Sequence, residues 1–176
     1  MAINKDSNTY TISFAIVLVI IVGGLLAAIA NGLKPIQDEN LVNEKKQNIL
    51  NCLPGNKSIT RDEAGSVFNN FVKQRVILNY NGEIKENTLL DNSVELNNKD
   101  SRDAFSIDLL KEYKTIKDEK SRNYPLFICD VEGKTYYVAP VMGKGLWAAV
   151  WGFIAIDELG NSISGTVFDH KSETPG

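Results

Sequence analysis

Two glycines around a lysine, followed by two tryptophans, form the part of this sequence best suited to chemistry. In Gly143-Lys144-Gly145-Leu146-Trp147 the glycines let backbone approach a ligand closely, and the segment also carries a cation and a flat ring. It lacks the third glycine of a dinucleotide fingerprint and the flanking residues of a P-loop. Trp147 and Trp151 suit either a hydrophobic core or stacking on a flavin or base. The residues alone therefore leave open a ligand-binding turn and a structural one.

The remaining reactive side chains do not form a set. His170 is the only histidine, so neither a histidine-rich metal site nor a serine–histidine–acid triad can be assembled. Cys52 and Cys129 match no zinc or redox spacing, and the sequence leaves open whether they meet. The formal charge is −3 and the lysines form no basic stripe. The sequence thus predicts no catalytic residue, no metal ligand and no nucleic-acid partner.

The stretch from Ile12 to Ala30 decides how the chain is anchored. Its nineteen residues carry no charge, and as a helix they would span about 28 Å, close to the ~30 Å core of a bilayer. A cleavable signal peptide is the alternative, because Ala28-Ile29-Ala30 fits a cleavage pattern and cleavage would release a secreted protein. The run is longer than the usual signal core of about 7–15 residues. This favours a retained single-pass anchor at residues 1–33, in contact with lipid through residues 12–30.

Residues 34–56 follow as an amphipathic juxtamembrane helix. Pro35 suits its first turn, and its apolar side chains repeat at helical spacing. Lys34, Lys45 and Lys46 follow the anchor, whereas only Lys5 and the terminal amine precede it. By itself this count slightly favours a domain on the cytoplasmic side.

Residues 57–176 combine one clear helix with several strands. Thr60 to Glu63 has the form of a capping box, ahead of a helix with an apolar face. One hairpin is expected to turn at Asn81-Gly82 with a positive φ at both residues, and another at Glu132-Gly133. Two further strands are expected at residues 151–156 and 163–168. These patterns predict an α+β domain with an antiparallel sheet and flanking helices.

Longer motifs resemble the C subunit of the sodium-translocating NADH:quinone reductase, a family related to the G subunit of the Rnf electron-transfer complex. They are LKPIQDEN, KKQNIL, AFSIDLLKEYK and PVMGKGLW-x-x-x-WGFIAID-x-x-GN-x-x-x-G-x-x-F-x-H-x-x-ETPG, in this order from Leu33 to Gly176. The resemblance implies a single-pass protein of the bacterial cytoplasmic membrane with an extracytoplasmic FMN-binding-type domain, against the lysine count. It also implies a subunit, not a stand-alone enzyme, that relays electrons from NADH toward quinone in a path that is coupled to sodium export.

The resemblance further indicates where the flavin would lie. The residues expected near the isoalloxazine are Lys144, Gly145, Leu146 and Trp147 of one motif and Glu173, Thr174 and Gly176 of the other. The family attaches FMN through its phosphate to a threonine in a Ser-Gly-Ala-Thr type motif, which this sequence does not contain. Ser164-Gly165-Thr166 is similar, but its alternating neighbours predict a strand. The flavin threonine is therefore expected beyond residue 176, in a longer copy of the chain, and not at Thr166.

Two other interpretations stay open. One is the G subunit of an Rnf-type complex, which shares the general plan. The other is an anchored extracytoplasmic binding or structural domain without a cofactor. The presence of bound flavin would distinguish either redox subunit from an anchored domain without a cofactor.

Overall fold

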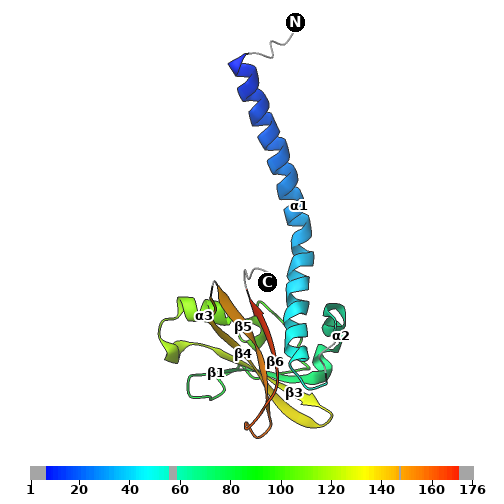
Figure 1. Ribbon diagram of the computed structural model, residues 1–176, viewed down its shortest axis with the longest axis vertical. Coiled ribbons are helices and arrows are strands. Elements are labelled where there is room, and N and C mark those ends of the chain that lie inside the picture. The colour runs from blue at the N-terminus through cyan, green and yellow to red at the C-terminus, as the bar shows by residue number, and fades with distance from the viewer. Residues whose placement is uncertain (1–6, 56–58, 147, 171–176) are drawn as a thin grey trace. The chain divides into compact units, whose positions relative to one another are not determined.

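The computed structural model describes residues 7–55, 59–146 and 148–170 and divides the chain into two compact units, Met1–Leu41 and Val42–Gly176. The first unit consists of most of helix α1 (Asn8–Asn51), which contains a stretch long and apolar enough to cross a membrane (Figure 1). Pro35 lies inside α1, not in the first turn of a second helix as expected. Proline removes one helical hydrogen bond there, and the carbonyl of Asn31 that loses it lies in an exposed part of the helix.

The second unit begins with the last turns of α1 and continues into α2 (Arg61–Phe71). The Thr60 hydroxyl accepts a hydrogen bond from the Glu63 N–H, and the Glu63 carboxylate accepts one from the Thr60 N–H at 2.9 Å. The predicted capping box is therefore confirmed. Arg61, at the start of α2, forms an ion pair with Glu44 of α1 at 3.1 Å.

Six strands form one antiparallel sheet in the order β2-β1-β3-β4-β5-β6. Their bounds are β1 (Val72–Leu78), β2 (Leu90–Asp91), β3 (Tyr124–Val131), β4 (Lys134–Lys144), β5 (Ala149–Asp157) and β6 (Ile163–His170). Three short helices lie between β2 and β3: η1 (Ala104–Ser106), α3 (Leu109–Thr115) and η2 (Glu119–Ser121). The α+β fold class with an antiparallel sheet is confirmed.

The two expected hairpin turns have different outcomes. Glu132 and Gly133 both have positive φ, 54° and 78°, as a two-residue β3–β4 turn requires. At Asn81-Gly82 only the glycine has a positive φ, of 82°, so that prediction was wrong. The reason is Asn79, whose side-chain oxygen accepts hydrogen bonds from the N–H groups of Asn81 and Glu83 at 2.9 and 3.0 Å. These bonds stabilise a longer loop in place of the two-residue turn.

The β3–β4 ladder ends where two prolines would face each other. Phe127 opposite Val138 is its last pair, and the same register would place Pro125 opposite Pro140. Because neither proline has an N–H, neither can donate the next ladder bond. Beyond this point β4 pairs only with β5, as far as Lys144. The end of the sheet that carries the β4–β5 loop therefore consists of β4, β5 and β6.

The hydrophobic core lies on one face of the sheet, under the end of α1, α2 and η1. Its largest apolar members are Ile49, Leu50, Leu53, Phe68, Phe105, Phe127, Val138 and Phe153. Phe68, Phe105, Phe127 and Phe153 form a row of edge-to-face contacts, with centroids 5.8 to 6.4 Å apart. The row runs from α2 through η1 to β3 and β5, so aromatic packing joins the helices to the sheet.

Glycine at position 165 permits the closest contact between α1 and the sheet. A Cβ atom there would lie only 2.0 Å from the Cys52 carbonyl oxygen, immediately after the last residue of α1. No side chain fits in that space, so Gly165 lets the end of α1 rest directly on β6. This contact also fixes the faces of β6, because Gly165 and Val167 face the core and the residues between and beyond them face away.

A buried ion pair holds the long segment between β1 and β3 against the sheet. Arg75 of β1 is 1% exposed, and its Nε donates to Asp103 Oδ1 at 2.9 Å. Its Nη2 donates to the Val94 carbonyl at 3.1 Å. The Asp103 carboxylate also accepts the N–H groups of Phe105 and Asn97, at 2.9 and 3.2 Å. These bonds pair the two buried charges with each other and with backbone groups, as buried ions require.

Candidate functional site

The Gly-Lys-Gly motif forms the loop between β4 and β5. Gly143 and Lys144 end β4, and the Gly145 N–H donates to the Ala148 carbonyl at 2.8 Å across the loop. A Cβ at Gly145 would lie 2.7 Å from that carbonyl oxygen, so this position requires glycine. Leu146, at the tip, is 84% exposed. The segment is thus a tight hairpin loop that presents an apolar side chain; Trp147 lies outside the described residues.

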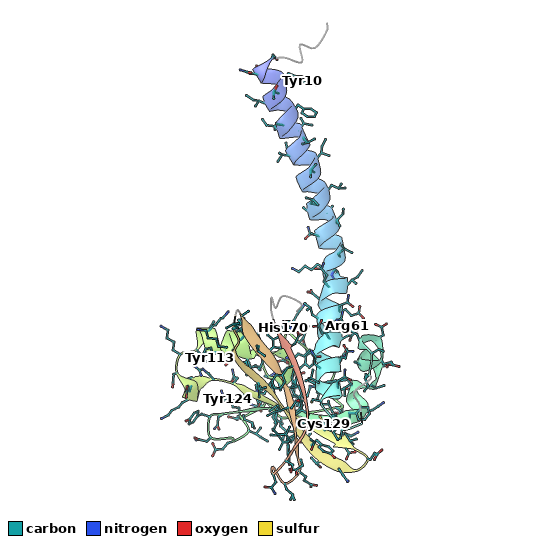
Figure 2. The ribbon with its side chains drawn as sticks, in the orientation of Figure 1. Tyr10, Arg61, Tyr113, Tyr124, Cys129 and His170 are labelled. Atoms are coloured by element: carbon teal, nitrogen blue, oxygen red, sulfur yellow. The ribbon has the colours of Figure 1, made fainter. Side chains whose placement is uncertain are left out.

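Strand register brings this loop beside the end of β6. Gly143 pairs with Val150, and Val150 pairs with His170. His170, which is labelled in Figure 2, is the last residue of β6. The chain therefore continues toward the second motif from the same end of the sheet as the loop. Of the residues predicted for a flavin site, the structure places Lys144, Gly145 and Leu146 at this end. Glu173, Thr174 and Gly176 lie outside the described residues, and their role stays a prediction.

Three exposed side chains of β6 extend the site along the face of the sheet opposite the core. They are Thr166, Phe168 and His170, which alternate with the core-facing Gly165 and Val167. Sequence reasoning did not select Phe168 or His170 for the site. The alternation of side chains along the strand could have grouped Phe168 with His170. To place them at the site, one would also have had to know which face of β6 meets the core.

Thr166 lies in a strand, as predicted. It pairs with Ile154 of β5, and its side chain is exposed. Crowding by the sheet therefore gives no reason to exclude modification at Thr166. The remaining argument against it is its place in a hydrogen-bonded strand, since an enzyme that attaches a group requires a segment that can leave the sheet.

The pKa of the Lys45 amine is strongly perturbed, and Lys45 lies away from this site. Its Nζ donates to the carbonyls of Phe105 and Ile107 at 2.5 and 3.2 Å and lies 4.7 Å from the Phe105 ring centroid. Burial lowers its pKa to about 8, against the opposing effect of Asp108 and Asp103. Lys45 thus joins α1 to η1 and the residue that follows it.

Both cysteines are buried and free. Cys52 follows α1 and its thiol donates to the Ile49 carbonyl at 2.9 Å, while Cys129 lies in β3. Burial raises the pKa of Cys52 to about 12 and also raises the pKa of Cys129, to which the nearby Cys52 contributes. Inert, protonated thiols of this kind belong to the core. Within the described ranges, no group of three or more histidine, cysteine, aspartate or glutamate side chains could hold a metal ion.

The chemistry available at the loop end of the sheet is that of a binding site. It offers an amine at Lys144, an imidazole at His170 and apolar surface at Leu146 and Phe168. There is open space at Gly143, where a Cβ would meet no atom within 4 Å. This set suits a flat, largely apolar ring with an anionic arm.

Comparison with known proteins identifies relatives over nearly the whole chain, although no protein-family model matches it. The chain is 28% identical over 174 residues to the C subunit of the Na(+)-translocating NADH-quinone reductase of Neisseria meningitidis serogroup A, covering 98% of this chain and 67% of that protein. It is 28% identical over 181 residues to the same protein of Vibrio anguillarum, covering 100% of this chain and 68% of that one. The corresponding protein of Pseudomonas aeruginosa is 27% identical, over 98% and 67%.

A solved structure agrees with these relatives. The crystal structure of the C subunit of the Na(+)-translocating NADH-quinone reductase from Parabacteroides distasonis matches with a TM-score of 0.63 and 32% identity. The match covers 81% of this chain and 60% of that one. The chain thus spans about two thirds of the curated relatives it matches and less of the solved one. Sequence motifs, fold and these relatives agree, and the chain is similar over nearly its whole length to C subunits of the Na(+)-translocating NADH-quinone reductase.

Proposed function

We propose that the chain is a membrane-anchored flavoprotein subunit that relays electrons from NADH toward quinone through FMN, within a complex that exports sodium. The observation that carries the proposal is the match to C subunits over nearly the whole chain, together with an α1 able to cross a membrane. The relatives described above are all C subunits of the sodium-translocating enzyme. This favours that family over the G subunit of an Rnf-type complex.

The residues at the loop end of the sheet fit FMN. Lys144 supplies a cation for the phosphate, and Leu146 supplies exposed apolar surface for the ring. We include Gly145, Trp147, Glu173, Thr174 and Gly176 in the site because of the family motifs. Bound FMN would supply one-electron chemistry, while the protein holds the ring in place and sets its electrostatic surroundings. The covalent attachment of the family is proposed to use a threonine outside residues 1–176.

FMN binding tests this proposal directly. The full chain in detergent should bind added FMN saturably. Lys144→Gln should weaken FMN binding more than riboflavin binding, because only FMN carries the phosphate. Lys134→Gln, at the opposite end of β4, is the matched control and should leave both affinities unchanged. If neither flavin bound, the chain would be an anchored domain without a cofactor.

We further propose that the soluble domain lies on the extracytoplasmic side of the bacterial inner membrane and contacts other subunits of the complex. The native cysteines cannot report this topology, because both are buried. Leu159, in the β5–β6 turn, is 80% exposed, so Leu159→Cys provides a suitable label site. A membrane-impermeant maleimide should label this variant in intact cells and leave the parent chain unlabelled. Labelling only after the inner membrane is broken would place the domain in the cytoplasm.

A further inference from the structure

Phe168 occupies a position that protein packing alone does not explain. It lies on edge strand β6 on the face away from the core, and it is 59% exposed. Burying a phenylalanine side chain away from water stabilises a protein by about 1.5–3 kcal/mol, and because the Phe168 ring is mostly exposed it contributes only a small part of that to the stability of the fold. A single exposed apolar residue is common on protein surfaces. The residue directly opposite Phe168 makes this one different.

That residue is Gly152 of β5, which pairs with Phe168 in the sheet. A Cβ at position 152 would lie 2.7 Å from the Phe168 Cδ1 atom and 2.2 Å from the Val167 carbonyl oxygen. Only glycine therefore lets the ring lie over the backbone of β5. The ring has backbone beneath it and an exposed remainder, which is the arrangement of a stacking surface.

The surroundings of Phe168 connect it to the candidate site. Gly152 pairs on its other side with Val141 of β4, a half-buried apolar residue on the same face. The next row toward the loop contains Gly143, Val150 and His170. Gly143 adds no side chain, so apolar surface and open space continue from Phe168 to the loop that carries Lys144.

We propose that Phe168 is the surface against which the isoalloxazine ring of FMN stacks, on the face of the sheet opposite the core. This inference rests on the proposed function and adds to it the residue and the face of the sheet. Aromatic rings stack with planar heteroaromatic systems with a gain of about 0.5–1.5 kcal/mol beyond the area they cover. Phe168 acts by positioning the ring and excluding water from one side of it. The glycine at position 152 is what allows that position.

A tryptophan placed at the stacking position gives a signal that a structural role would not produce. Indole in contact with isoalloxazine quenches flavin fluorescence by electron transfer, and the proposed site already contains the Trp147 indole. In a Trp147→Phe background of the full chain, Phe168→Trp should therefore shorten the fluorescence lifetime of bound FMN several-fold. Leu159→Trp, in the β5–β6 turn that precedes β6, is the matched control and should leave the lifetime unchanged. Phe168→Leu should weaken FMN binding about 2- to 10-fold. Circular dichroism confirms that each variant is folded.

The outcomes separate this inference from the proposed function. If the wild type binds FMN but Phe168→Trp leaves its lifetime unchanged and Phe168→Leu leaves its affinity unchanged, the stacking proposal is wrong. A lifetime that lengthens on Trp151→Phe would also overturn it, because Trp151 lies on the face of β5 that carries the core residue Phe153. If the wild type does not bind FMN at all, the proposed function fails, and this inference fails with it.

Discussion

The contact between Gly165 and the end of α1 allows a prediction whose size follows from the structure. In Gly165→Ala the new Cβ would lie 2.0 Å from the Cys52 carbonyl oxygen and 3.0 Å from its carbon. Ordinary contact begins at 3.4 Å, so two backbone segments must separate by more than an ångström. Overpacking of this kind costs about 1–3 kcal/mol. For a domain of this size that corresponds to a fall in Tm of about 3–12 °C.

Thermal unfolding of the full chain in detergent, followed by the circular dichroism of the sheet, measures this loss. Gly143→Ala on β4 is the matched control, because its Cβ would meet no atom within 4 Å and its φ is not positive. The control should be neutral or more stable by about 0.5–1 kcal/mol, since alanine loses less backbone entropy than glycine. Equal Tm values for the two variants would refute the argument that Gly165 is required for α1 to rest on β6.

Three further predictions concern the buried charges and Thr166. Arg75→Met should destabilise the domain by about 3–5 kcal/mol in urea unfolding, because Asp103 loses its buried partner. Arg61→Met, which breaks an exposed pair with Glu44, should cost less than about 1 kcal/mol, and similar losses would contradict the argument. The folded-state pKa of Lys45 is about 8, below its ordinary value of 10.5, so between these pH values the unfolded chain holds a proton that the folded chain has released. The stability of the wild type relative to Lys45→Met should therefore rise from pH 8 to pH 10.5 and be constant below pH 8, and a fall in that window would be inconsistent with this pKa. Thr166→Ala should keep any flavin adduct of a longer chain, and an FMN mass on a peptide spanning Ile163 to Lys171 would show the opposite.

Local features of the fold could be predicted from the sequence because their causes lie within a few residues. The capping box of Thr60 and Glu63 and the turn at Glu132-Gly133 each depend on one short motif. The turn at Asn81-Gly82 failed for the same kind of reason, since Asn79 offered a competing side-chain hydrogen bond just before it. Short motifs therefore predict structure well only where no neighbouring polar side chain offers the backbone another partner.

Pairs that are distant in sequence could not be predicted. Arg75 and Asp103 are charged residues that each follow a polar neighbour, and the sequence gives no sign that the two pair in the interior. Lys45 reads as part of a solvated helix face, yet it donates to carbonyls about sixty positions away. Such contacts follow from where η1 packs against α1, which is decided by the whole core and not by either segment.

A single motif at the candidate site combines a feature that the sequence predicts with one that depends on a distant contact. The pattern G-x-x-F-x-H in β6 indicated the family, but its letters lie on two faces of one strand. Gly165 faces the core and makes room for α1, whereas Phe168 and His170 face outward beside the β4–β5 loop. Because the side chains of a strand alternate, placing Gly165 against Cys52 fixes the outward face of every other residue in β6. One buried contact, invisible in the sequence, therefore determines which side of the sheet carries the exposed aromatic ring that we propose as the stacking surface.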